Sequence, residues 1–450
     1  MKKIILLFAC FGLSNNIEAQ TITTFAGNGP ENEVTGTFAG DGGQATAASL
    51  SRPSDICIDG TGCLLIADGH NNRVRKVNTA GIITTIAGTG INGNSGDGGP
   101  ATAAQLNGPN GVTTDKYGNI YITSITQICK VSIAGIITTI AGTGTVGYSG
   151  DGGQATAATL RASTATMDSV GNFLIADAGN HCIRKVTASG IISTIAGTGI
   201  QGFSGDGAPA SAAQLYGPGS IAFDKAGNMF IVDGLNLRIR KIDTAGIITT
   251  IAGNGTNMVG GNGGPASVAT LSNTVTIALD GADNIYMTES NGNIVRRIDH
   301  TSGIITKVAG DGVTVCGFAG DGGPASAAQL CGPAGLAIDV TGRVYFTDVK
   351  NHRVRRLSST LAVEEVMQGK PTTINVTPNP AISGLLTLNL PTAHNEQMLV
   401  TVTDITGKVI KSISAETNKP VAIQLNAPAG IYLLTVRTGS GVWKERVAVQ

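Results

Sequence analysis

Charged residues are scarce in this sequence: they make up 13% of its 450 residues, against about 25% in an average soluble domain. A coiled coil or a helical bundle needs many Glu, Lys and Leu residues, so this composition argues against both. The 30 basic and 30 acidic residues balance. No overall charge therefore attracts nucleic acid or an anionic membrane, and we expect no nucleic-acid partner. Disorder is also disfavoured, because 41% of the residues are hydrophobic.

Long hydrophobic runs are lacking as well. The N-terminal apolar run, Ile4 to Leu13, follows Lys2 and Lys3 and is followed by the small residue Ala19. This is the layout of a secretory signal peptide, residues 1–19, with cleavage after Ala19. The run is too short to cross a bilayer of about 30 Å as a helix, and no longer run occurs elsewhere. We therefore expect an exported protein without a transmembrane segment.

Cysteine is infrequent, and its spacing argues against a common type of metal site. Six of the seven cysteines follow residue 19, and they form neither a CxxC pair nor a Cys/His pattern typical of zinc. Disulfides are permitted in an exported protein, although so few cysteines are not its main source of stability. Cys10 lies inside the apolar run, and a lipoprotein acylated at Cys10 is the alternative to a cleaved signal peptide.

Glycine, by contrast, is abundant, with 64 residues. The segment IITTIAG begins at Ile82, and near copies begin at five other positions: Thr21, Ile136, Ile191, Ile247 and Ile304. After a first interval of 61 residues, the intervals are 54, 55, 56 and 57 residues. A nearly fixed period of this length indicates one supersecondary unit that is repeated along the chain.

Each unit contains four short segments rich in β-branched residues, with turns such as Asp59-Gly60-Thr61-Gly62 between the first two. Four-stranded units arranged around an axis are the blades of a β-propeller. The sixth unit has no fourth strand after Val354–Leu357, but the missing segment lies at Thr21–Gly27. We expect an all-β, six-bladed β-propeller over residues 20–357, in which this N-terminal strand closes the last blade and leaves no open edge.

Two turn segments carry a recognisable motif: Asn180-His181-Cys182-Ile183-Arg184 and Asn351-His352-Arg353-Val354-Arg355. Together with the repeated unit, they resemble the NHL-repeat family from Thr21 to Leu357. The resemblance implies a six-bladed propeller, in agreement with the number of units. Propellers of this family bind proteins, sugars or RNA and occasionally act as lyases, so the resemblance alone implies no particular activity.

The repeat ends near Ser358, and residues 358–371 are typical of a linker before a second β module, residues 372–450. This module contains Thr377-Pro378-Asn379-Pro380, Val400–Asp404 and Ala429-Gly430-Ile431-Tyr432. In their order and position they resemble the C-terminal sorting domain of the type IX secretion system. The resemblance implies a small β-sandwich, a partner in the type IX secretion machinery, and a protein that is secreted or anchored on the outer cell surface. An ordinary β-sandwich with a ligand of its own is the alternative.

An acidic residue ends the second strand of five units, and an Arg follows seven residues later. The pairs are Asp68 with Arg75, Asp177 with Arg184, Asp233 with Arg240, Glu289 with Arg296, and Asp348 with Arg355. The second unit has Ser124 and Cys129 instead. Because losing one member of a buried pair leaves an uncompensated charge, the joint loss predicts an ion pair within each blade. A ring of carboxylates for acid–base chemistry or metal binding is the alternative.

At one repeated position of the loops between units, a carboxylate or amide stands between glycines: Asp41, Asp97, Asp151, Asp206, Asn262 and Asp321. A stretch of small residues follows, such as Pro100-Ala101-Thr102-Ala103-Ala104. Pro at the first position of a helical turn, with the Asp capping its free amides, explains this pattern without a ligand. The alternative is a weak binding site: if the loops meet near the channel, the six side chains attract a basic partner or a cation such as Ca²⁺.

Sequence signatures of common enzymes do not occur: there is no GxSxG, HExxH or Walker loop. The loops are nearly identical, whereas an active site needs several different groups that converge. We therefore expect a non-catalytic binding or adhesion scaffold for an extracellular protein, glycan or matrix ligand, and assign no catalytic residue, metal or cofactor. The alternative is an extracellular propeller lyase or hydrolase with a metal at one propeller face.

Cys316 and Cys331 have no counterparts in the other units, yet both lie in the same connection between blades. Two independent substitutions rarely coincide in this way, and an exported protein meets oxidising conditions. We predict a disulfide between them. The alternative is a pair of small thiols that only pack.

Overall fold

Strands form most of the regular structure, in agreement with the all-β prediction. The structure is a computed structural model that describes residues 20–29, 36–358, 375–382, 384–390, 395–404, 408–438 and 441–449. The expected signal peptide, and residues 359–371 of the expected linker, lie outside the described residues. The chain divides into two units, residues 1–361 and 362–450. Among the described residues, no helix has the length and apolar character that a membrane span requires.

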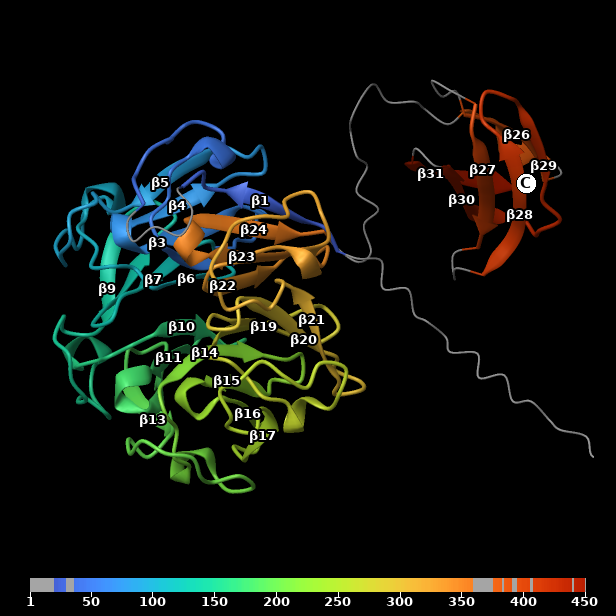
Figure 1. Cartoon of the computed structure of the whole chain (residues 1–450). Coiled ribbons are helices and arrows are strands. Elements are labelled where there is room, and N and C mark those ends of the chain that lie inside the picture. The colour runs from blue at the N-terminus through green and yellow to red at the C-terminus, as the bar shows by residue number, and fades with distance from the viewer. Residues whose placement is uncertain are drawn as a thin grey trace, which may run out of the picture. The chain divides into compact units, whose positions relative to one another are not determined.

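The described residues of the first unit form six four-stranded antiparallel sheets, numbered here 1 to 6 along the chain (Figure 1). Sheet 1 consists of β2 (Pro53–Ile58), β3 (Leu64–Asp68), β4 (Arg73–Val77) and β5 (Ile83–Ala87). Sheet 2 consists of β6 (Gly111–Thr114), β7 (Ile120–Thr123), β8 (Ile128–Val131) and β9 (Ile137–Ala141). Sheet 3 consists of β10 (Thr164–Met167), β11 (Phe173–Asp177), β12 (Cys182–Val186) and β13 (Ile192–Ala196).

The other three sheets repeat this order of strands. Sheet 4 consists of β14 (Pro218–Phe223), β15 (Met229–Asp233), β16 (Arg238–Ile242) and β17 (Ile248–Ala252). Sheet 5 consists of β18 (Thr274–Leu279), β19 (Ile285–Glu289), β20 (Ile294–Ile298) and β21 (Ile305–Ala309). Sheet 6 consists of β22 (Pro333–Ile338), β23 (Val344–Asp348), β24 (Arg353–Leu357) and the N-terminal β1 (Ile22–Ala26).

The position of β1 confirms the prediction made for Thr21–Gly27. This strand is antiparallel to β24, with Ile22 opposite Leu357 and Thr24 opposite Arg355. The backbone N–H of Ser358 also donates to the carbonyl of Thr21 at 2.9 Å. Both ends of the repeat region therefore lie in one sheet, and β1 covers the edge that β24 would otherwise leave unpaired.

An Asp side chain organises the hairpin between the first two strands of each sheet. In sheet 1, Asp59 accepts hydrogen bonds from the backbone N–H groups of Thr61 and Cys63, while Gly62 has a left-handed backbone with φ of 79°. Glycine adopts this conformation without steric cost, and Asp stabilises the turn by binding its own backbone. Corresponding Asp residues bind the turn in the other sheets: Asp115, Asp168, Asp224, Asp280 and Asp339.

The core consists of side chains packed between neighbouring sheets. The first strands contact one another in cyclic order, β2 to β6, β10, β14, β18, β22 and back to β2. Between sheets 6 and 1, for example, Ile56 and Ile66 pack with Tyr345 and Val354. Each fully buried aliphatic side chain of this kind contributes about 1.5–3 kcal/mol. The sheets form a β-propeller, and its core depends on contacts between neighbours in the cycle.

A turn residue with a left-handed backbone links several neighbouring sheets. Asn72 of sheet 1 accepts a hydrogen bond from the backbone N–H of Gly108, at the start of sheet 2. The same bond joins sheets 3 and 4 and sheets 5 and 6, through His181 with Gly217 and Asn293 with Gly332. The His of the NHL motif is therefore used structurally here, and Asn serves the same purpose. In sheet 4 the position is occupied by Leu237, which has no side-chain acceptor.

Short 3₁₀ helices occupy the loops. Those between sheets are η1 (Ala45–Ala47), η3 (Ala101–Ala103), η4 (Ala155–Ala157), η6 (Ala210–Ala212), η8 (Ala266–Val268) and η9 (Ala325–Ala327). Those after the second strands are η2 (Gly69–Asn71), η5 (Ala178–Asn180), η7 (Gly234–Asn236) and η10 (Val349–Asn351). The predicted capping of the first set by the loop Asp is wrong. Pro100 itself is the N-cap of η3, and no side chain caps that helix.

The predicted disulfide between Cys316 and Cys331 is confirmed. It closes a loop of 15 residues in the connection from sheet 5 to sheet 6. In the chain-entropy model, closing a loop of this length stabilises the folded state by about 3 kcal/mol. The four other described cysteines, Cys57, Cys63, Cys129 and Cys182, are free thiols.

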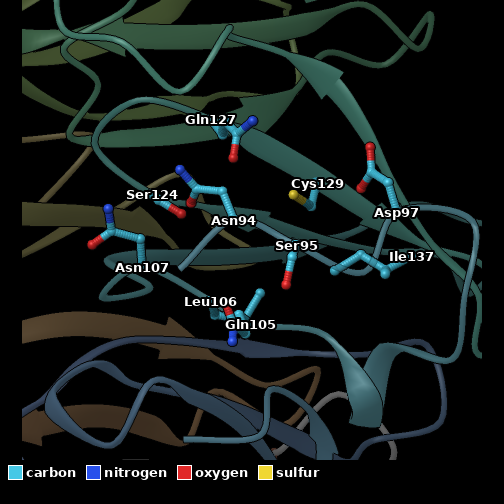
Figure 2. Close-up of a pocket in the computed structure, with 10 residues that line it drawn as sticks. All are labelled: Asn94, Ser95, Asp97, Gln105, Leu106, Asn107, Ser124, Gln127, Cys129 and Ile137. Carbon is cyan, nitrogen blue, oxygen red and sulfur yellow. The ribbon is translucent and has the colours of Figure 1, made fainter. Parts of the chain in front are cut away.

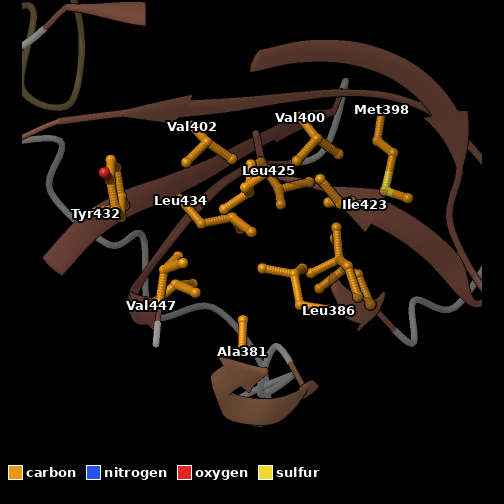
Figure 3. Packing of buried hydrophobic residues seen from close by; sticks show 14 residues of the cluster. Ala381, Leu386, Met398, Val400, Val402, Ile423, Leu425, Tyr432, Leu434 and Val447 are labelled. Carbon is orange, nitrogen blue, oxygen red and sulfur yellow. The ribbon is translucent and has the colours of Figure 1, made fainter. Parts of the chain in front are cut away.

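The second unit is a separate all-β structure. Its strands are β25 (Asn375–Ile382), β26 (Leu385–Asn389), β27 (Gln397–Thr403), β28 (Val409–Glu416), β29 (Val421–Gln424), β30 (Gly430–Thr438) and β31 (Gly441–Val449). They follow the order β28-β27-β30-β31-β25-β26-β29, with β25 joining two groups. Side chains from both groups, among them Leu386, Val400, Ile423 and Leu434, meet in one buried cluster (Figure 3). The strand order is continuous, and the small β-sandwich stays a prediction.

Candidate functional site

Five buried ion pairs lie within the sheets, as predicted from the spacing of acid and Arg. The pairs have N–O distances between 3.1 and 3.6 Å, and both side chains of each pair are fully buried. Burial raises the pKa of all five carboxyl groups, to about 6 for Asp68, and the Arg beside each one opposes that rise. The acid also accepts a backbone N–H from the incoming loop, at 2.7 Å from Ser51 to Asp68. Each pair fixes a loop to its sheet.

The six loop residues bind the outer strands of the sheets. Four of the Asp residues form a second salt bridge to the buried Arg, with N–O distances of 2.6–2.8 Å: Asp41, Asp151, Asp206 and Asp321. Asn262 accepts from Arg296 at 3.1 Å. Asp97, whose sheet has no such Arg, accepts the backbone N–H of Thr139 in β9. The acid of the loop and the acid of the strand thus share one guanidinium in four sheets.

This placement corrects the expectation that the loop residues meet near the channel. Each lies beside the third and fourth strands of its own sheet, whereas the first strands form the inner cycle. Gly42, next to Asp41, donates its N–H to the carbonyl of Ile83 in the outermost strand of sheet 1. The loop runs along the outside of a sheet before it reaches the first strand, so the six side chains are held apart by the sheets between them.

Aromatic side chains cover the buried Arg in four sheets. The guanidinium of Arg75 lies 4.7 Å from the ring centre of Phe38, and that of Arg184 lies 5.0 Å from Tyr148. Phe203 and Phe318 lie over Arg240 and Arg355 in the same way. Such contacts stabilise a cation by about 0.5–2 kcal/mol and exclude water from the pair.

The first strands of the six sheets line a cavity of about 740 Å³, measured with its opening to solvent. Its wall includes the hydroxyl-bearing residues Thr113, Thr166, Ser220 and Thr276, from four different sheets. Apolar side chains such as Ile56 complete the wall. A concave site on which several polar groups converge is a common candidate for ligand binding. The cavity is therefore the strongest candidate in the structure.

Asp55 is the acidic side chain in the described lining of this cavity. Its Oδ2 accepts the backbone N–H of Val112, in the first strand of sheet 2, at 3.0 Å. Burial raises its pKa to about 7, although the bond from Val112 opposes the rise. The sequence prediction missed Asp55. A signal was present, because the other five first strands carry uncharged residues at this position: Gly111, Thr164, Ser220, Thr276 and Gly335.

Neither group of acids forms a metal site among the described residues. Within the part of the chain that the structure describes, no three His, Cys, Asp or Glu side chains lie close enough together to hold a metal ion. The arrangement instead supplies one isolated carboxylate in a polar channel and a set of acids already paired with Arg. The first can accept a proton or bind a donor group of a ligand, and the second holds the fold together.

Three family models match the sequence. The teneurin NHL domain matches residues 15–95, 89–149 and 200–260, and the NHL repeat matches residues 330–357. The secretion system C-terminal sorting domain matches residues 375–450. The matches agree with both resemblances found in the sequence, and each falls within one of the two structural units.

Similar proteins were found by sequence and by structure. Teneurin-1 of Gallus gallus is 30% identical over 230 residues, which cover 45% of this chain and 8% of that protein. A structural genomics protein of unknown function from Bacteroides thetaiotaomicron has a TM-score of 0.55 at 16% identity, and an auxiliary nutrient binding protein from Bacteroides ovatus has 0.52 at 16%. Both structural matches cover 76% of each chain. At such low identity they show the fold alone.

The repeated sheets of the first unit agree with the NHL matches, and the separate second unit agrees with the sorting-domain match. The first unit carries NHL repeats, and the sorting domain implies export by the secretion machinery. The chain is therefore an NHL-repeat β-propeller protein with a type IX secretion system C-terminal sorting domain.

Proposed function

We propose that this protein is a non-catalytic binding protein that acts outside the cell or on its outer surface. In this proposal the six sheets are the blades of a closed six-bladed propeller over residues 20–357, and the ligand binds in the channel between the first strands. The tail, residues 372–450, is a two-layer β-sandwich that directs the chain through the type IX machinery. The single observation that carries the ligand site is Asp55, an unrepeated carboxylate in the wall of the channel.

The chemistry of the channel favours a ligand rich in hydrogen-bond donors. Asp55 has one oxygen bound to Val112, and an ionised carboxylate has acceptor capacity for further donors. Hydroxyl side chains such as Thr113 and Thr276 both donate and accept. Among the expected ligand classes, a glycan with several hydroxyl groups suits this wall better than an apolar or acidic surface. The Bacteroides ovatus protein of similar fold, described as nutrient binding, is consistent with this choice.

The experiment is a glycan array followed by calorimetric titration of the sugars that bind. The parent protein is compared with Asp55→Asn and with Asp97→Asn, which changes an acid beside the fourth strand of sheet 2. We expect Asp55→Asn to weaken binding at least ten-fold and Asp97→Asn to leave it unchanged. Equal affinity of the parent and Asp55→Asn would place the ligand elsewhere. Tightly held metal at one per chain, together with turnover in a lyase and esterase screen, would favour the enzyme alternative.

Export is tested separately. A chain that ends at residue 373 lacks the residues matched by the sorting-domain model, 375–450. It should fold as a propeller and remain in the periplasm, whereas the full chain appears outside the cell. Because the two structural units have separate cores, the melting temperature of the propeller should not change. Normal appearance of the shortened chain outside the cell would contradict this role of the tail.

A further inference from the structure

The buried Arg has the same three oxygen acceptors in sheets 1, 3 and 5. In sheet 3, Arg184 donates to the Asp151 carboxylate at 2.6 Å, to the carbonyl of Ser149 at 2.8 Å and to that of Thr159 at 3.2 Å. Sheets 1 and 5 repeat the set: Arg75 with Asp41, Ala39 and Ser49, and Arg296 with Asn262, Gly260 and Thr270. The loop and the third strand therefore build a guanidinium site as part of the repeat.

Sheet 2 keeps the acceptors and lacks the cation. By alignment of the loops, Ser95, Asp97 and Gln105 occupy the positions of the three acceptors. Cys129 takes the place of the Arg, and Ser124 takes the place of the strand acid. The Cys side chain is much shorter than Arg and carries no positive charge to occupy the site.

Asp97 is nevertheless held as its counterpart in sheet 3 is held. The backbone N–H of Thr139 donates to Oδ2 of Asp97 at 3.0 Å, and that of Thr194 donates to Oδ2 of Asp151 at 3.0 Å. In sheet 3 the other oxygen, Oδ1, contacts the Arg. Among the described residues, Asp97 forms no salt bridge. Its Oδ1 is thus oriented for a cation that sheet 2 does not supply.

A hollow of about 250 Å³, measured with its opening to solvent, lies at this position. Figure 2 shows Ser95, Asp97, Gln105 and Cys129 around it. Asn94 occupies the loop position at which Phe38, Tyr148, Phe203 and Phe318 cover the Arg in other sheets. Without an aromatic cover, the site is open to a group from outside.

We propose that this hollow binds the guanidinium group of an arginine side chain from a partner protein. The site lies on the outside of sheet 2, so the inference does not depend on ligand binding in the central channel. An anionic partner is disfavoured by the Asp97 carboxylate.

Arginine fits the acceptors better than lysine does. A guanidinium presents five N–H donors in a rigid plane and forms paired bonds to a carboxylate, whereas an ammonium is a compact point charge. In sheet 3, two nitrogens of Arg184 contact the same oxygen of Asp151 while the third reaches a carbonyl. The acceptors of sheet 2 offer the same fork.

In the test, the peptide acetyl-Gly-Arg-Gly-amide is titrated into the mature full chain at low salt, and binding is measured by NMR. We expect one peptide per chain and at least ten-fold weaker binding of the Lys peptide. Asp97→Asn should weaken binding of the Arg peptide at least ten-fold, and this exposed residue can be changed without loss of the fold. The double variant Ser124→Asp with Cys129→Arg restores the internal pair found in the other sheets, so it should fold and bind no peptide.

Asp55→Asn is the matched control, because Asp55 lies in the channel, and it should bind the Arg peptide as the parent does. Unchanged binding by the double variant, or equal binding of the Arg and Lys peptides, would overturn the proposal. So would the absence of binding by the parent. Tighter binding of free L-arginine than of the peptide would overturn the assignment to a protein partner.

Discussion

Nδ1 of His352 accepts a hydrogen bond from the backbone N–H of Arg52 at 3.0 Å, although 300 positions separate the two residues. His352 ends the turn after the second strand of sheet 6, and Arg52 precedes the first strand of sheet 1. The bond is the same one that joins sheets 1 and 2 through Asn72. The bond therefore joins the last sheet to the first, while β1 brings the N-terminal end of the repeat region into the last sheet.

This bond leads to a prediction about His352. His352→Leu introduces the residue found at the equivalent position of sheet 4, and it leaves the N–H of Arg52 without its acceptor. We expect the free energy of unfolding to fall by about 1–3 kcal/mol, measured by urea denaturation. His352→Asn should retain most of the stability, because Asn accepts the same bond in sheets 1 and 5.

Leu237→Asn is the reciprocal variant. Leu237 has a φ of 55°, and Asn is tolerated in the left-handed region better than Leu. The change should stabilise the protein, by about 1 kcal/mol if the new bond to the loop of sheet 5 forms. If His352→Leu and the parent unfold at the same urea concentration, this account of the turn residue is incorrect.

The buried pair of Asp68 and Arg75 leads to a prediction about losing one member or both, and sheet 2 is the natural case in which both are absent. Arg75→Cys leaves the buried Asp68 carboxylate without its cation, and the expected loss of stability is about 3–5 kcal/mol. The double variant Asp68→Ser with Arg75→Cys copies Ser124 and Cys129 of sheet 2 and should lose less than the single variant. Chemical denaturation measures both; additive losses would show that the two side chains are not coupled.

Removal of Thr21–Gly27 should open sheet 6. The unpaired edge of β24 then presents backbone groups to other chains, so we expect aggregation or the loss of a single cooperative melting transition. Light scattering and calorimetry are the measurements, with the chain beginning at Gln20 as the control. A shortened chain that melts as the control does would contradict closure by β1.

Asp55 makes stability depend on pH in a predictable direction. Burial raises its pKa in the folded protein to about 7, while an exposed Asp in the unfolded chain titrates near pH 4. Between these values the folded state holds more protons, so stability falls as the pH rises, by up to about 1.4 kcal/mol per pH unit. From pH 4 to 7, the free energy of unfolding of the parent should therefore fall relative to that of Asp55→Asn. Parallel curves in urea denaturation would exclude a raised pKa.

The disulfide predicts the labelling pattern of the mature protein. Alkylation after denaturation without a reductant should label the four free thiols, Cys57, Cys63, Cys129 and Cys182, and leave Cys316 and Cys331 in one linked pair of peptides. After reduction all six should be labelled. Labelling of Cys316 and Cys331 without a reductant, in protein recovered from the medium, would refute the bond.

Much of the fold follows from patterns within one repeat. The period of IITTIAG, the four strands and the Asp-Gly turns each depend on residues close together in sequence, and so does the spacing of seven between acid and Arg. A hairpin brings residues at that spacing side by side: Asp68 faces Arg73, and Arg75 is the diagonal neighbour. The position of β1 was also predictable. The last unit lacks its fourth strand and the chain begins with one extra strand, so pairing the two completes the last sheet.

The binding partners of the loop side chains are decided by the tertiary structure. Asp97 and its counterparts stand before a helical turn in the sequence, which suggested capping, or a ring near the channel. In five sheets the actual partner is an Arg 33 or 34 residues later in the chain, as for Asp151 and Asp41. Asp97, whose sheet lacks the Arg, binds the edge of the fourth strand. A stronger, charge-assisted hydrogen-bond donor was available at that distance, and nothing in the loop alone shows it.

The sequence by itself determined the repeat, the strands, the buried pairs, the disulfide and the two units, because these depend on short-range pattern and on departures from it. Only the tertiary structure decided that Asp55 lines the channel, that His352 holds Arg52, and that an open guanidinium site remains in sheet 2. Each of these depends on the surface that one sheet presents to its neighbour or on the space left beside it. That space is set by the packing of residues tens to hundreds of positions apart, which a single repeat does not encode.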